Sequence, residues 1–393
     1  MQTLLRRFLS ILEGKTPDRL PWFGDLCYWH FAMSKRGMLE ERYRGFEGIL
    51  NLHKDLNVGL YLQAYDPFLP EYKNCEVFEV QRDVGVYEEF ASVYRGAKVI
   101  KKENNNDIIR TITTPLGTIK EKWPYVPVSF SWAPQEYLIK TENDLKVFKY
   151  WLKNTSYKED YNHVLMVKEK VGENGFSLCY QPRSPLMGFM ILYAGVTNTV
   201  NLIMDYNKLF NEVIKILEYK SDEAAEITLN SPAEFIMLPE NLSSDVVGKK
   251  FFEKYLRPYE EKWNKKIRDR GKYSFIHMDG YLKGLLKEVA STGFSVIEAM
   301  TPKPVGDLEV SEFRDYATDD TICWGGIPGT FFTPSINDQK FEEFVLSVIK
   351  TMVSEPAYVL GIADQIPPDG IIERVKIVSD LVEKYGFYQN KSS

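Results

Sequence analysis

Short apolar runs recur along the chain, and most are followed by a segment in which apolar residues have helical spacing. An apolar run of four to eight residues between polar segments is typical of a buried strand. The segments NKLFNEVIKILEYKSDEAAEI (207–227) and QKFEEFVLSVIKTMVSE (339–355) place apolar residues at i, i+3 and i+4, which predicts helices. We predict strands at 19–26, 57–63, 176–181, 234–238, 273–278, 295–300, 321–326 and 357–363.

Alternation of strands and helices predicts a parallel sheet, and eight such strands favour a closed (β/α)8 barrel, the TIM-barrel fold. We therefore expect residues 1–393 to form a single barrel domain. An open dinucleotide-binding sheet is the alternative, and it is disfavoured because no GxGxxG follows any predicted strand.

One region, 74–126, breaks the alternation because its pattern is strand-like throughout. Its segment IIRTIT (108–113) is rich in β-branched residues, and the polar run Asn104–Asp107 predicts a turn before it. We expect an inserted, antiparallel β-hairpin element after the second barrel strand.

Composition and charge narrow the class of protein. The chain has 393 residues, 44% hydrophobic and 26% charged, with a net charge of −6 and no basic stripe, so we expect no nucleic-acid partner. No apolar run approaches the roughly 20 residues that span a bilayer, and the start reads as an amphipathic helix, so we expect no membrane association. Four scattered cysteines without a CxxC pair favour a reduced, cytoplasmic protein.

Polar residues follow most of the predicted strands, where the reactive groups of a TIM barrel lie. They are Asp25, Tyr28 and Trp29 after the first strand, Tyr180, Gln181 and Arg183 at the third, Glu240 and Asn241 at the fourth, His277 and Asp279 at the fifth, Glu298 in the sixth and Asp364 after the eighth.

Each of these residues also has an ordinary structural explanation. Asp25, Asp279 and Asp364 have the type and position of helix N-caps. A lone histidine at a strand end is more often a satisfied structural group than a ligand. Glu298 is harder to explain in this way, because it stands inside an apolar run. It must face the barrel mouth or be buried unpaired, which costs several kcal/mol.

Several segments together resemble the uroporphyrinogen decarboxylase superfamily, which includes the decarboxylase and zinc-dependent methyltransferases that use methylated corrinoid proteins. The similarity covers most of the chain, is strongest from about residue 230 onward, and implies a (β/α)8 barrel. It rests on TPDRLPWFGDL, TTPLGTIKEKW, EFIMLPENLSS, FFEKYLRPYEEKW, HMDG, GFSVIEAMTPKPVGDL, WGGIPG and GIADQIPPDGIIERV.

The chain departs from both branches of that superfamily. The decarboxylase has an arginine-rich segment after its first strand, and here that segment reads GDLCYWHFAMSKRG. The methyltransferases hold zinc with a His-x-Cys pair and a later Cys. The corresponding residues here are His277, Asp279 and Asp364, so the resemblance implies a divalent metal, in the first place zinc, held by one imidazole and two carboxylates.

The leading hypothesis is therefore a methyltransferase-like enzyme with a metal-activated acceptor and a small-molecule substrate. Any corrinoid would come on a separate partner protein, since the chain has no DxHxxG motif. The alternative is a metal-independent, decarboxylase-like lyase that acts on a tetrapyrrole or another carboxylate, and a non-catalytic binding barrel is a third possibility. Glu240 and Glu298 are the expected proton-handling residues, and the expected substrate-binding residues are Trp22, Asp25, Tyr28, Trp29, Tyr180, Gln181, Arg183 and Asn241.

Overall fold

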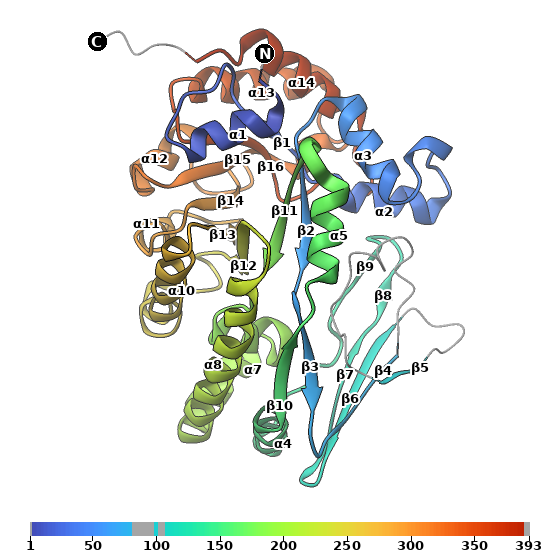
Figure 1. The fold of residues 1–393 in the computed structure, drawn as a ribbon, viewed down its shortest axis with the longest axis vertical. Coiled ribbons are helices and arrows are strands. Elements are labelled where there is room, and N and C mark those ends of the chain that lie inside the picture. The colour runs from blue at the N-terminus through green and yellow to red at the C-terminus, as the bar shows by residue number, and fades with distance from the viewer. Residues whose placement is uncertain (1, 81–97, 101–106, 389–393) are drawn as a thin grey trace.

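A parallel barrel forms the centre of the computed structural model, which describes residues 2–80, 98–100 and 107–388 (Figure 1). In this described part, eight strands follow the order β1-β16-β15-β14-β13-β12-β11-β2. A bridge between Phe23 and Gly59 closes the ring, and the Gly59 amide donates to the Trp22 carbonyl at 2.9 Å. The strands are β1 (Trp22–Phe23), β2 (Leu60–Tyr65), β11 (Gly175–Tyr180), β12 (Phe235–Leu242), β13 (Tyr273–Met278), β14 (Val296–Met300), β15 (Ile322–Pro328) and β16 (Tyr358–Ala363).

Helices surround the barrel and connect its strands, which confirms the predicted (β/α)8 fold (Figure 1). The α-helices of this layer are α2 (Cys27–Arg36), α3 (Gly45–Leu56), α5 (Asn162–Val171), α6 (Pro185–Gly188), α7 (Val196–Asp205), α8 (Asn207–Asn230), α9 (Lys249–Phe251), α10 (Arg257–Asp269), α11 (Leu286–Ala290), α12 (Phe313–Tyr316), α13 (Asp338–Met352) and α14 (Glu373–Tyr385). Two π-helical segments, η4 (Phe189–Ala194) and η5 (Phe252–Leu256), and the short 3₁₀ turns η1 (Glu41–Tyr43), η3 (Gly172–Asn174), η6 (Val310–Glu312) and η7 (Gly329–Phe332) complete it.

Within the described ranges, no single helix is long and apolar enough to cross a bilayer. Only the pair Pro185–Ala194 and Val196–Asp205 passes when taken together, and it is bent by 114°.

The β-rich insertion follows β2, as predicted, and extends away from the barrel beside α4 (Glu142–Lys153) (Figure 1). One sheet has the order β5-β4-β6-β7, and two smaller pairs are β10 with β3 and β8 with β9. Its strands are β3 (Phe68–Tyr72), β4 (Glu76–Val80), β5 (Lys98–Ile100), β6 (Ile108–Thr114), β7 (Gly117–Trp123), β8 (Tyr125–Val126), β9 (Ser131–Trp132) and β10 (Thr155–Glu159).

The expected hairpin across 104–107 is not the one that forms. β5 pairs in parallel with β4, whereas β6 pairs antiparallel with β7 around a turn at Pro115 and Leu116. Residues 104–106 of the expected turn lie outside the described residues. Alternation explains the observed hairpin, because Ile108, Arg110 and Ile112 are all buried on one face of β6.

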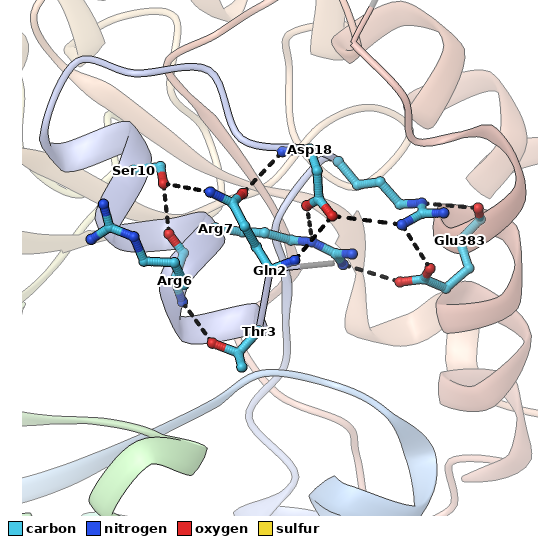
Figure 2. Close-up of polar contacts among 8 residues, drawn as sticks. Gln2, Thr3, Arg6, Arg7, Ser10, Asp18 and Glu383 are labelled. Carbon is cyan, nitrogen blue, oxygen red and sulfur yellow. Dashed lines mark hydrogen bonds and ion pairs between the residues drawn. The ribbon is translucent and has the colours of Figure 1, made fainter.

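The N-terminal helix α1 (Leu4–Leu12) closes one end of the barrel with an aromatic side chain. Phe8 is fully buried, stacks on Phe176 at 4.8 Å between ring centroids, and meets Trp324 edge-on at 5.4 Å. The neighbouring Arg7 is 2% exposed and pairs with Asp18 at 2.7 Å and Glu383 at 3.1 Å (Figure 2). The helix thus closes this end by apolar packing and is held in place by two ion pairs of the buried Arg7.

Side-chain alternation along the barrel strands decides which residues face the interior. The interior cluster contains Phe23, Tyr61, Phe176, Phe235, Phe275, Val296, Trp324 and Val359, together with Phe8 of the helix that closes the barrel. Positions two residues further along each strand, such as His277 after Phe275 and Glu298 after Val296, therefore face the carboxyl-terminal mouth. The intervening positions face the helix layer.

Candidate active site

The carboxyl ends of three barrel strands have unusual backbone geometry. Asn241, Ala299 and Asp364 all have left-handed φ angles, of 50°, 67° and 74°. Such conformations are uncommon in residues other than glycine and cluster at functional sites. Beside Ala299 the register of β14 and β15 breaks, and a Cβ at Gly325 would lie 2.2 Å from the Met300 carbonyl oxygen. The strand ends thus turn their side chains in directions that a regular strand would not permit.

His277 is the centre of a chain of polar contacts at this mouth. It is the direct neighbour of Glu298 in the β13–β14 ladder, and its Nδ1 lies 2.7 Å from Glu298 Oε2. Its Nε2 faces Asp364 Oδ1 at 3.8 Å. The sequence predicts that Glu240, His277, Asp279, Glu298 and Asp364 converge on one cavity at this face. Of that set, the structure brings His277, Glu298 and Asp364 together.

Tyr61 completes the chain, and sequence reasoning missed it. Its hydroxyl donates to Glu298 Oε1 at 2.9 Å, and both side chains are 3% exposed. The only signal was a tyrosine within the apolar run 57–63, on the face that alternation turns inward. A buried phenol needs a polar partner, so this position could have been singled out.

The electrostatic surroundings favour a protonated His277. Burial by itself lowers the pKa of this imidazole, but the adjacent Glu298 carboxylate, with Asp364 and Asp279, outweighs burial and raises the pKa to about 10. At neutral pH the ring is therefore an imidazolium flanked by carboxylates.

Asp364 is the outermost member of the chain, with a side chain that is 56% exposed. Removal of water by the walls of the mouth raises its pKa, His277 acts in the opposite direction, and repulsion from Glu298, Asp25 and Asp279 adds to the increase. The resulting pKa is about 6. An acid whose pKa lies near neutrality suits general acid–base chemistry, because both protonation states are populated.

Asp25 and Tyr28 lie at the same mouth. Asp25 is 4% exposed, accepts from the Cys27 amide at 2.7 Å and from Gln365 Nε2 at 2.9 Å, and burial raises its pKa. The N-cap of α2 is Leu26, so Asp25 is not the helix N-cap; it accepts from the first residue of the helix, and its charge acts on Asp364. The Tyr28 hydroxyl donates to the Ser129 carbonyl, and Gln365 is a second residue that sequence reasoning missed.

The expected metal ligands can be tested against the geometry of their donor atoms. Within the described ranges, no group of three or more His, Cys, Asp or Glu side chains is placed to hold a metal ion. His277 uses one ring nitrogen for Glu298, and its other nitrogen faces Asp364 at 3.8 Å. Asp279 acts on both residues only through its charge. As placed, the donors do not fit a three-ligand metal site, and we derive no step through a metal.

Glu240 lies away from the chain of contacts at His277. It follows Leu238 and Ile236 on the face of β12 that packs against the helices, and it is fully buried. Its carboxylate accepts from the Ser184 amide at 2.6 Å and the Ser184 hydroxyl at 2.9 Å. Burial raises its pKa to about 6, and these two hydrogen bonds and Arg183 act in the opposite direction. Its expected place beside His277 is therefore wrong, because alternation turns it outward.

The other expected substrate-binding residues are placed as follows. Trp22 is fully buried on the outer face of β1 and donates to Ser379 of α14 at 3.1 Å, which contradicts its expected place at the mouth. Trp29 donates to the Gly370 carbonyl at 2.9 Å, which ties α2 to the loop after β16.

The remaining expected substrate-binding residues belong to the ends of β11 and β12. Tyr180 ends β11 and lies on its inward-facing side, and Asn241 near the end of β12 is exposed. Arg183 acts on Glu240, and Gln181 is 1% exposed.

Comparison with known proteins identifies similar structures and a sequence family. A search of curated proteins finds no match. The solved structure of a methyltransferase from Methanosarcina mazei has a TM-score of 0.56 and 15% identity, and the alignment covers 98% of this chain and 99% of that one. A nitroalkane oxidase from Streptomyces ansochromogenes has a TM-score of 0.26 and 9% identity over 51% and 53% of the two chains, which is too low to support any argument.

The methyltransferase shares the fold of this chain. At 15% sequence identity, the similarity is evidence for the fold alone. The sequence match is to the family model described as uroporphyrinogen decarboxylase (URO-D), over residues 148–385. This range runs from within α4 to the end of α14 and contains β11 to β16, and so both His277 and Asp364. The chain belongs to the URO-D family.

Proposed function

We propose that this protein is an enzyme that transfers a methyl group, with Asp364 as the general acid that protonates the leaving atom of the methyl donor. The observation that carries the proposal is the polar chain Tyr61–Glu298–His277–Asp364, which ends in an acid of pKa about 6 at the barrel mouth. General acid catalysis by a positioned side chain is worth about 10²–10⁴-fold in rate.

In the proposed step the methyl group passes from a heteroatom of the donor to the acceptor. The bond between the methyl carbon and its heteroatom breaks, the acceptor attacks the methyl carbon, and the heteroatom leaves with the proton of Asp364. His277 stays protonated and stabilises the Asp364 carboxylate that results. The methyl acceptor comes from outside the chain, and a corrinoid on a partner protein is the acceptor that the family resemblance implies.

Decarboxylation is the second candidate, and the match to the uroporphyrinogen decarboxylase family model favours it. Asp364 would then protonate the carbon that loses carbon dioxide. The charge at the mouth opposes a substrate with many carboxylates, because Asp25, Asp279 and Glu298 all repel negative charge at Asp364 and, among the described residues that act on its pKa, only His277 is a cation. In the segment that corresponds to the arginine-rich segment of the decarboxylase, Arg36 donates to the Pro368 carbonyl at 2.7 Å.

The test uses free cobalamin in place of a partner protein. Purified protein is mixed with reduced cobalamin and a panel of O-, N- and S-methyl compounds, and methylation of the cobalt is followed by absorbance. We expect at least one donor to react, and we expect Asp364→Asn to lower kcat by about 10²–10⁴-fold. Asp380→Asn, on the exposed side of α14, is the matched control and should react like the wild type.

Two results would overturn the proposal. One is release of carbon dioxide from porphyrinogens or other carboxylates without any methyl transfer, which would establish the second candidate. The other is a methyl-transfer rate that Asp364→Asn leaves unchanged. Elemental analysis of the same samples after incubation with zinc tests the metal separately. One equivalent of zinc that both Asp279→Ala and Asp364→Ala remove would show that the donors rearrange around a metal.

A further inference from the structure

The side chain of Tyr61 is held in place by aromatic packing around its ring and by a hydrogen bond at its hydroxyl. It lies on the inner face of β2, and its ring packs edge-on against Trp324 at 5.0 Å and stacked on Phe176 at 6.2 Å between centroids. These contacts hold the ring plane, so the hydroxyl has little freedom to move. Burial and the nearby Glu298 and Asp25 carboxylates raise the pKa of the phenol well above its ordinary value of 10.0, so its proton remains available for donation.

Glu298 depends on two partners, one for each carboxylate oxygen. Oε1 accepts from Tyr61 at 2.9 Å, and Oε2 bonds to His277 Nδ1 at 2.7 Å. The side chain is 3% exposed, so water cannot substitute for a lost partner at full strength. A carboxylate held at both oxygens has a fixed plane, whereas one held at a single oxygen can rotate about its terminal bond.

The orientation of His277 follows from that of Glu298. The bond to Nδ1 sets the plane of the imidazole and thereby the direction of Nε2. The 3.8 Å between Nε2 and Asp364 Oδ1 exceeds a hydrogen-bond length, so a small rotation of the ring alters this approach substantially.

We propose that Tyr61 is a positioning residue that fixes the plane of Glu298 and, through it, directs His277 toward Asp364. This role rests on the proposed function, because it concerns the residues that support Asp364 as the acid. Among the described residues the Tyr61 hydroxyl donates to Glu298, so its effect on His277 and Asp364 passes through that carboxylate.

The test is proton NMR of the protein with isotope-labelled histidine. In the wild type, the buried Nδ1–H of His277 should give a downfield resonance that is protected from exchange, and His277→Gln assigns it. Tyr61→Phe should weaken this resonance or lose it to exchange while thermal melting shows a folded protein. The matched control is Tyr259→Phe, which removes another buried phenol, one whose hydroxyl donates to the Pro182 carbonyl at 3.4 Å in the helix layer. It should leave the resonance intact.

Kinetics supply the second measurement once a methyl donor is known. Tyr61→Phe should lower kcat by about tenfold to a hundredfold, as loss of an orienting partner commonly does, with KM unchanged. A His277 resonance in Tyr61→Phe identical to that of the wild type would overturn the positioning role, whatever the activity. A lost resonance combined with full activity of Asp364→Asn would instead support the role of Tyr61 and overturn the proposed function.

Discussion

Asp364 combines a left-handed backbone with a raised pKa at the mouth of the barrel. Its φ of 74° is one that asparagine and aspartate adopt more readily than most residues, which explains why a short polar side chain can end β16 here. The acid is also surrounded by Asp25, Asp279 and Glu298, which repel its ionised form. A residue with both properties serves the site at a cost to stability.

Asp364→Asn should therefore keep the fold and gain stability above pH 6. The pKa of Asp364 rises from 3.8 to about 6 on folding, so between these values the folded state keeps a proton that the unfolded state releases. The contribution of this group to stability thus falls as the pH rises through that window and stays lower above it. Because 56% of the side chain is exposed, the gain should stay under about 1 kcal/mol.

Thermal melting of the wild type and Asp364→Asn from pH 4 to pH 8 measures this difference. The two curves should approach each other at the acid end and separate in favour of the variant toward neutrality. A variant that melts lower than the wild type at pH 8 would contradict the raised pKa of Asp364.

The sequence allowed part of this site to be predicted, for reasons that differ from residue to residue. His277 and Asp364 follow apolar runs, and Glu298 interrupts one, so their polarity stands out. Tyr61 does not stand out, because a tyrosine ring is ordinary in an apolar strand. Its hydroxyl bonds to Glu298, which is 237 positions away in the sequence. Contacts between residues so far apart depend on barrel closure, which local pattern does not encode.

At the scale of single elements, alternation along β12 decides the role of Glu240. The sequence placed this residue at a strand end, but a shift of one residue turns a side chain from the mouth to the helix layer. There it meets α10, whose Glu260 is also fully buried. Among the described residues, no side chain donates to either Glu260 oxygen or to Asn264 Oδ1 in favourable geometry, and the nearby hydroxyl of Thr292 donates its proton to the Val289 carbonyl at 2.8 Å.

This arrangement predicts that Glu260 is a neutral acid in the folded protein. Burial raises its pKa well above 4.5, and the charge of Glu240 adds to the effect. The folded state therefore keeps a proton that the unfolded state releases as the pH rises above about 4.5, so wild-type stability declines from that point toward the folded pKa. Glu260→Gln retains the shape, cannot ionise, and therefore removes this decline.

We expect Glu260→Gln to be more stable than the wild type at pH 8 by about 1–3 kcal/mol, the range for an unsatisfied buried polar group. Chemical denaturation at pH 5 and pH 8 measures the difference, which should be larger at pH 8. The control is Glu261→Gln, the next residue along α10, which pairs with Arg257 on the exposed side. Equal stability of Glu260→Gln and the wild type at pH 8 would mean that the acceptors have a donor.

At the scale of the whole molecule, the barrel depends on the N-terminal helix to close the end opposite the site. The sequence predicted an amphipathic helix there, and the structure places α1 across this end of the barrel (Figure 1). Phe8 packs against Phe23, Phe176, Phe235, Phe275 and Trp324. The helical pattern revealed the apolar face of α1, but the partner of that face exists only after the barrel has closed.

Phe8→Ala should therefore destabilise the barrel as a unit, by about 3–5 kcal/mol, because it removes a fully buried ring and leaves a cavity among aromatic side chains that are themselves held by the strands. Phe251→Ala, which truncates a ring that is 36% exposed, is the control and should cost far less. Denaturant unfolding measures both.

The His277 Nδ1–H resonance should persist in folded Phe8→Ala, because the hydrogen bond of His277 at the mouth depends on Glu298 and Tyr61. Loss of that resonance without unfolding would instead show that packing at the closed end is transmitted along the strands to the site. A cost below about 1 kcal/mol would show that α1 does not hold the barrel closed.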